Sequence, residues 1–90
     1  MPVISSFAGI LIYIYLEKNG KHKTPHVHAI YNEFDMSIDF EGNILAGELP
    51  PKKQKLVEAW VILHSEELYA TWKAYTEFNE VLKIKGLEWV

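Results

Sequence analysis

The 90-residue chain contains no cysteine. This absence excludes disulfide bonds, a thiolate nucleophile and any cysteine-ligated zinc or iron–sulfur site. Long apolar runs are also lacking: the longest, residues 7–16, is too short to cross a bilayer and lacks the flanking signals of a secretion peptide. We therefore expect a cytoplasmic protein from a reducing compartment, with no membrane partner.

A strong charge of either sign is missing as well. Nine basic residues against twelve acidic ones give a formal net charge of −3, so nucleic acid is not attracted globally and phosphate binding would require a local patch. Hydrophobic residues make up 49% of the chain and charged residues 23%, which is typical of a packed globule. The length fits one domain over residues 1–90.

The first half of the chain predicts an antiparallel sheet. Its first apolar run has aliphatic side chains at every even position from Ile10 to Leu16, which indicates one strand covered on both faces. The next segment alternates apolar and polar side chains, which predicts a hairpin that turns at Asn32 and Glu33 with one face buried. The predicted strands are residues 6–16, 26–31, 34–40 and 44–47.

Counting outward from this hairpin turn fixes the strand register, because side chains on one face repeat every second residue. The predicted cross-strand pairs are Tyr31 with Phe34, His28 with Ser37, and His26 with Asp39. A slip by one residue would move every apolar side chain to the wrong face. We therefore expect this register whatever the turn type.

The second half of the chain predicts helices at residues 51–63 and 66–76. Pro51 suits a first helical position, and Ser65 followed by two acids is typical of a new helix start with a side-chain cap. One continuous helix is the alternative, because apolar residues keep helical spacing through the junction. The C-terminal tail is residues 76–90, and its part from residue 81 to residue 90 alternates in part, which predicts an extra strand or an extended arm. The expected fold class is α+β, with an antiparallel sheet of three to four strands followed by two helices on one face.

Three segments carry a family resemblance over about residues 1–75. They are PHVH at 25–28, GELPP at 47–51, and Trp60 followed by LHSEEL at 63–68. The chain resembles short bacterial proteins catalogued as domain of unknown function 4160. The resemblance implies a setting typical of toxin–antitoxin gene pairs and a protein partner encoded nearby. It implies no catalytic residue and no cofactor.

His26 and His28 are the most suggestive polar pair. Residues two apart in a strand project from the same face, so two imidazoles could share a metal ion. Asp39, the predicted neighbour of His26, would be a third ligand or would orient the imidazole. The alternative is that both histidines are solvated or bind backbone groups near the preceding loop.

His64 and Glu67 form a weaker catalytic candidate. On a continuous helix this spacing would place a base beside the acid that orients it. The alternative is structural: His64 would end the first helix, and Glu67 would favour the positive N-terminal end of the second.

Lys52, Lys53 and Lys55 crowd the first turn of the first helix, where cations oppose the helix dipole. They are candidates for binding phosphate or nucleic acid, together with lysines of the first loop (Lys18, Lys21 and Lys23). The alternative is a solvated face whose charges are partly balanced by Glu48 and Glu58.

Tyr13 and Tyr15 are candidates for a partner surface, because a first strand that is apolar on both faces leaves one side to be covered by the tail or by another chain. The leading hypothesis is a protein-binding component of a two-gene module, and a homo-oligomer is also compatible. The second hypothesis is a small nuclease-like toxin that engages RNA through the lysines and uses His26, His28 or His64.

Overall fold

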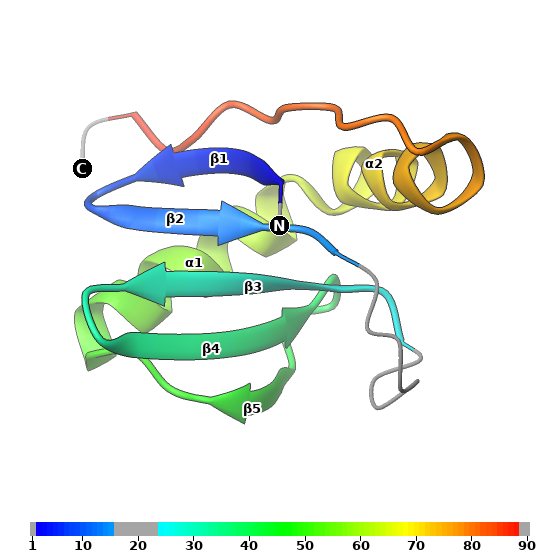
Figure 1. The fold of residues 1–90 in the computed structure, drawn as a ribbon. Helices are drawn as coiled ribbons and strands as arrows, with labels where there is room; N and C mark the ends of the chain where they lie inside the picture. Colours follow the sequence, from blue (N-terminus) through cyan, green and yellow to red (C-terminus); the bar gives the residue numbers. More distant parts are fainter. Residues whose placement is uncertain (1, 16–23, 89–90) are drawn as a thin grey trace.

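The computed structural model describes residues 2–15 and 24–88, which form a five-stranded antiparallel sheet followed by two helices (Figure 1). The strands are paired in chain order from β1 to β5. The predicted α+β class is confirmed, with one strand more than expected. The elements are β1 (Val3–Phe7), β2 (Ile10–Tyr13), β3 (His26–Tyr31), β4 (Phe34–Asp39), β5 (Ile44–Gly47), α1 (Pro51–Leu63) and α2 (Ser65–Phe78).

The prediction of one strand over residues 6–16 is wrong, because the chain turns back at Ala8 and Gly9. Both residues have positive φ, 53° and 78°, which is the geometry of a tight two-residue hairpin turn. Phe7 then pairs with Ile10, and β1 runs antiparallel to β2. Ala-Gly is a weaker turn sequence than Asn-Gly because alanine resists positive φ. With so weak a turn signal inside an apolar run, the sequence predicted one strand instead of two.

The predicted register of the second hairpin is confirmed. Asn32 adopts a φ of 53° in the turn between β3 and β4. The observed pairs include Tyr31 with Phe34, His28 with Ser37, and His26 with Asp39. The position of the turn and the apolar alternation together therefore determined the pairing, as expected for a sheet that packs one face on a core.

Gly47 ends β5 at a point where only glycine fits. Its φ is +73°, and a Cβ atom at this position would lie 2.0 Å from the backbone oxygen of Asp35 on β4. The strand also contains a bulge, since Ser37 pairs with Ala46 but the next residue, Ile38, pairs with Ile44. This short, bulged strand forms one edge of the sheet.

The prediction of two helices is confirmed, and the alternative of one continuous helix is wrong. Pro51 opens α1 at its first position, and the break falls at His64, whose φ of −108° and ψ of 22° are not helical. The predicted Ser65 cap is wrong, because this hydroxyl donates a hydrogen bond to the backbone oxygen of Phe40 instead. That bond ties the helix junction to the end of β4.

Helix α1 packs on one face of the sheet (Figure 1). Figure 1 shows α1 behind β3 and β4, with α2 toward the end of the sheet where β3 begins. Apolar side chains from alternate strand positions meet α1 there, and Trp60 is fully buried among them. The central members of this core are Ile10, Ile12, Ile14, Val27, Ala29, Met36, Ile38, Val57, Trp60 and Val61.

The tail forms an extended arm and no further regular strand as far as residue 88. It follows α2, which ends at Asn79 in a left-handed conformation (φ 55°), and runs alongside β1 (Figure 1). The Ile84 N–H donates to the Ile4 oxygen at 2.8 Å, and the Ile84 side chain is buried. The Trp60 indole N–H donates to the Lys85 oxygen at 2.9 Å, so the arm is attached to both the sheet and α1.

Candidate functional site

The sheet face opposite α1, called the front face here, carries an apolar patch. Leu11 pairs with Ile30 and Val3 pairs with Tyr13, so these side chains lie on one face of three adjacent strands. Leu11 is 39% exposed, and the other three are partly exposed. We call Val3, Leu11, Tyr13 and Ile30 the front patch. The candidate Tyr13 thus lies within an apolar surface that residues 2–15 and 24–88 leave partly exposed.

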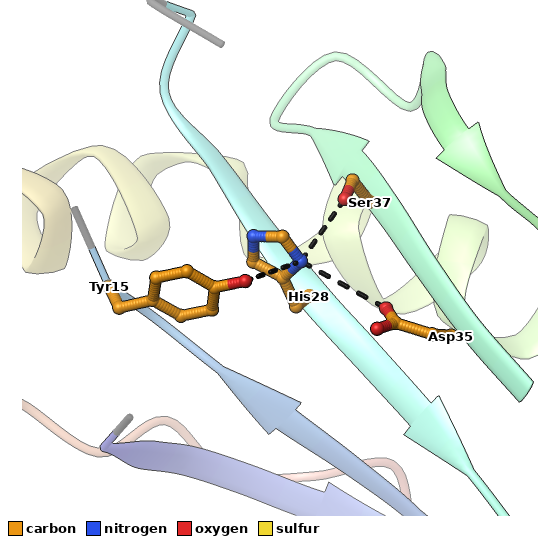
Figure 2. Close-up of polar contacts among 4 residues, drawn as sticks. All are labelled: Tyr15, His28, Asp35 and Ser37. Atoms are coloured by element: carbon orange, nitrogen blue, oxygen red, sulfur yellow. Dashed lines mark hydrogen bonds and ion pairs between the residues drawn. The ribbon is translucent and has the colours of Figure 1, made fainter. Parts of the chain in front are cut away.

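A polar cluster around His28 adjoins the front patch, because His28 is the cross-strand neighbour of Tyr13. Figure 2 shows three side chains directed at its Nδ1 atom. The Ser37 hydroxyl lies 3.1 Å away, the Tyr15 hydroxyl 3.4 Å and the nearer Asp35 carboxylate oxygen 4.0 Å. The Tyr15 ring also stacks on the imidazole, with ring centroids 4.3 Å apart. The candidate Tyr15 therefore packs on His28.

This cluster does not have the geometry of a Ser-His-Asp triad. In a triad, the serine and the acid contact different nitrogen atoms of the imidazole, so that one orients the ring while the other loses a proton. Here Ser37 and Asp35 both approach Nδ1 of His28. His28 is only 6% exposed and Ser37 is also buried. The arrangement is suited to holding Tyr15 and His28 in place beside the front patch.

His26 is almost completely buried, at 1% exposure, at the end of the sheet nearest α2. Its Nδ1–H donates to the Thr24 backbone oxygen at 2.8 Å, which leaves Nε2 as the acceptor in the neutral ring. Its ring lies 5.0 Å from that of His28 and 5.8 Å from that of Trp72. The two histidines are therefore neighbours, as predicted, in a largely buried setting.

Asp39 is the cross-strand partner of His26, but its carboxylate also holds the turn between β4 and β5. Oδ1 accepts hydrogen bonds from the backbone N–H groups of Glu41 and Asn43 at 2.9 and 2.8 Å, and Oδ2 accepts one from the Asn43 side chain at 3.1 Å. Burial raises the pKa of this carboxyl, but the hydrogen bonds from Asn43, Glu41 and Gly42 outweigh burial and hold the pKa below its ordinary value.

We expect Asp39→Ala to lower the free energy of unfolding by about 1–3 kcal/mol at neutral pH, because three hydrogen bonds to a buried carboxylate are lost. A lowered folded-state pKa stabilises the fold above the unfolded pKa of about 3.9, and this stabilisation is lost as pH falls through the folded value. Urea unfolding of both proteins should therefore give a difference that shrinks below about pH 4. A difference independent of pH would contradict this role of the carboxylate.

The predicted metal cluster lacks a third ligand in the part of the chain that the structure describes. Among residues 2–15 and 24–88, no group of three or more histidine, aspartate or glutamate side chains is arranged to hold a metal ion. The Asp39 carboxylate already accepts three hydrogen bonds from the turn. Metal binding by His26 and His28 stays a prediction, and such a site would need ligands besides these two.

His64 and Glu67 are brought together as predicted. The Nδ1–H of His64 donates to Oε1 of Glu67 at 2.6 Å, and the imidazole ring lies 5.6 Å from the Trp60 ring. The pair sits at the helix junction, where His64 both ends α1 and precedes α2. This geometry fits an oriented base and equally fits the structural alternative, in which His64 ends α1 and Glu67 lies in the first turn of α2.

The lysines of α1 do not act as one group. The Lys53 ammonium donates to the Ala8 backbone oxygen at 2.7 Å and lies 4.8 Å from the centre of the Tyr31 ring. It therefore braces the turn between β1 and β2, which explains a cation at an unfavourable helix end. Lys52 and Lys55 are exposed. The first-loop lysines proposed to extend this patch, Lys18, Lys21 and Lys23, lie outside the described residues.

Sequence reasoning missed most of the front patch. It treated residues 6–16 as one strand, so Val3 and Ile30 were not placed beside Tyr13. The missed signal was the glycine at position 9, which allows a hairpin and brings β1 back along β2. Ser37 was paired with His28, but the sequence did not indicate that Asp35 and Tyr15 join the same cluster.

Neither described helix has the length and apolar character that crossing a membrane requires. In comparison with known protein families, a model described as a domain of unknown function (DUF4160) matches residues 9–73. The match extends from the turn between β1 and β2 into α2, and it leaves out β1 and the arm. No curated protein and no solved structure matches the chain.

Proposed function

Since the chain belongs to the DUF4160 family of domains of unknown function, we propose its function from its surface: it is the protein-binding component of a two-gene module of the toxin–antitoxin type. It binds a partner protein, encoded nearby, through the front patch. The observation that carries the proposal is the contiguous apolar surface formed by Val3, Leu11, Tyr13 and Ile30 on three adjacent strands.

The composition of this surface supports binding of a protein. Contiguous apolar patches with a polar rim mark interaction sites, and a tyrosine gives a large contact area with little loss of side-chain entropy. Tyr13 and Leu11 are two residues apart on β2, so their side chains share the front face. The cross-strand neighbour of Tyr13, His28, is held in place by Ser37 and Tyr15. A patch on paired strands with a fixed polar neighbour is preorganised, which lowers the cost of binding.

The test is coexpression of the chain with its neighbouring gene, followed by purification and measurement of the dissociation constant of the complex. We expect Leu11→Glu to weaken the complex by about 100-fold or more, because a charge would be buried at the centre of an apolar contact. Leu63→Glu is the matched control, since Leu63 is 70% exposed at the end of α1 and lies outside the front patch.

Growth and RNA integrity should be followed in the same cells. Absence of a complex with the neighbouring gene product, or normal binding by Leu11→Glu, would contradict the proposed function. Growth arrest with RNA cleavage that is lost in a folded His26→Ala or His28→Ala variant would favour the nuclease-like alternative instead.

A further inference from the structure

Charge is distributed unevenly around the front patch. Residues 32–50, which contain β4 and β5, include five acidic residues and no lysine or arginine. Their charge of −5, against −3 for the whole chain, leaves +2 for the remaining residues. The segment that contains β4 and β5 is therefore acidic, although the protein as a whole is close to balanced.

Asp35 brings this negative charge to the border of the front patch. It is the cross-strand partner of Ile30, so its side chain stands beside that residue on the front face. The side chain is 66% exposed, and the facing titratable group is His28, whose Nδ1 lies 4.0 Å from the carboxylate. A basic group of a partner could reach Asp35 without burying it.

Lys83 lies beside Val3, at the border of the front patch opposite Asp35. The arm runs along β1, and a shallow hollow of about 260 Å³ between them is lined by Val3, Ser6 and Lys83, among others. Lys83 is exposed and shares this hollow with Val3, a member of the front patch. The order across the sheet is thus a lysine on the arm, apolar side chains on β1, β2 and β3, and an aspartate on β4.

We propose that the front patch binds an apolar strip of a partner protein that carries a basic side chain where it meets Asp35 and an acidic side chain where it meets Lys83. The inference rests on the proposed function and specifies the partner's chemistry. With strands about 4.8 Å apart, β1 and β4 are separated by roughly 14 Å, so the two charges fix the direction in which the partner lies across the sheet. Oppositely directed binding would place like charges together at both ends.

The test uses charge reversals in the complex with the neighbouring gene product. Asp35→Lys and Lys83→Glu are each expected to weaken binding by about tenfold at low salt, mainly through slower association, and the effect should diminish at high salt. Glu66→Lys and Lys73→Glu are matched controls, because both residues are exposed on α2 and make the same changes in net charge. Thermal unfolding of each variant checks that the fold is retained.

The outcomes separate this inference from the proposed function. If Leu11→Glu abolishes binding while Asp35→Lys and Lys83→Glu bind no more weakly than their controls, the charge arrangement is overturned and protein binding by the patch stands. If Leu11→Glu binds like the wild type, or if no complex forms, both proposals are overturned. Weakening by both reversals, with unchanged controls, supports the inference.

Discussion

Replacing Trp60 with alanine is expected to lower the free energy of unfolding by about 3–5 kcal/mol, as is typical for removal of a large buried aromatic side chain. Trp60 is fully buried, and its ring packs 5.4 Å from that of Phe7 and 5.6 Å from that of His64. Its indole N–H also holds the arm through the Lys85 oxygen. The substitution therefore opens a cavity where α1, β1 and the arm meet.

Urea unfolding followed by circular dichroism measures this effect. Domains of this size are stable by only about 5–15 kcal/mol, so the variant should be partly unfolded at moderate temperature. Trp60→Phe keeps most of the ring but loses the N–H donor, and we expect it to cost about 1–2 kcal/mol. Leu63→Ala, at an exposed position of the same helix, should change stability by less than about 0.5 kcal/mol. Equal losses for Trp60→Ala and Leu63→Ala would contradict the proposed position of the core.

Replacing Gly47 with alanine is expected to cost about 2–5 kcal/mol. Positive φ costs an L-residue roughly 1–2 kcal/mol, and overpacking adds about 1–3 kcal/mol. Overpacking is severe here because the new Cβ would lie 2.0 Å from the Asp35 oxygen, and this oxygen belongs to the backbone of β4. The clash can be relieved only by separating β5 from β4.

Gly42→Ala provides the matched control for this prediction. Gly42 also has positive φ, +91°, but a Cβ there would lie 3.4 Å from the end of the Ile62 side chain, which is an ordinary contact. We therefore expect Gly42→Ala to cost about 1–2 kcal/mol, from backbone strain alone. Chemical denaturation of the two variants should rank Gly47→Ala well below Gly42→Ala. The reverse order would show that the close approach of the two strands is not maintained in solution.

The sequence predicted the fold best where the apolar periodicity and the turn signals agreed on one arrangement of strands or helices. The hairpin of β3 and β4 was predicted residue by residue, because the alternation fixes the face that buries Met36 and Ile38 and the turn at Asn32 fixes the count along the strands. The end of α1 at Leu63 was also predicted correctly. The first hairpin was missed because apolar side chains continue through the turn at Ala8 and Gly9, and periodicity cannot distinguish a long buried strand from two short ones.

The candidate site was predictable only in part, because its members meet through tertiary structure. The pairing of His26 with Asp39 followed from counting, but counting could not show that the Asp39 carboxylate binds the turn at Asn43. Likewise, no local pattern linked Lys53 to Ala8, which is 45 residues earlier in the chain. Such contacts depend on the angle at which a helix crosses the sheet, which sequence spacing does not specify.

The backbone hydrogen bond between Ile84 and Ile4 joins distant parts of the chain, whereas the contacts within the sheet join neighbouring segments. Each strand pairs with its neighbour in the sequence, so the meander is built from relatively local contacts that favour rapid folding. The arm instead joins residues 80 positions apart, and closing so long a loop has an entropic cost. This cost is lower once the sheet has formed, because the sheet shortens the loop that remains to be closed. Docking of the arm is therefore expected to be a late folding event, with β1 left as an open edge until it occurs.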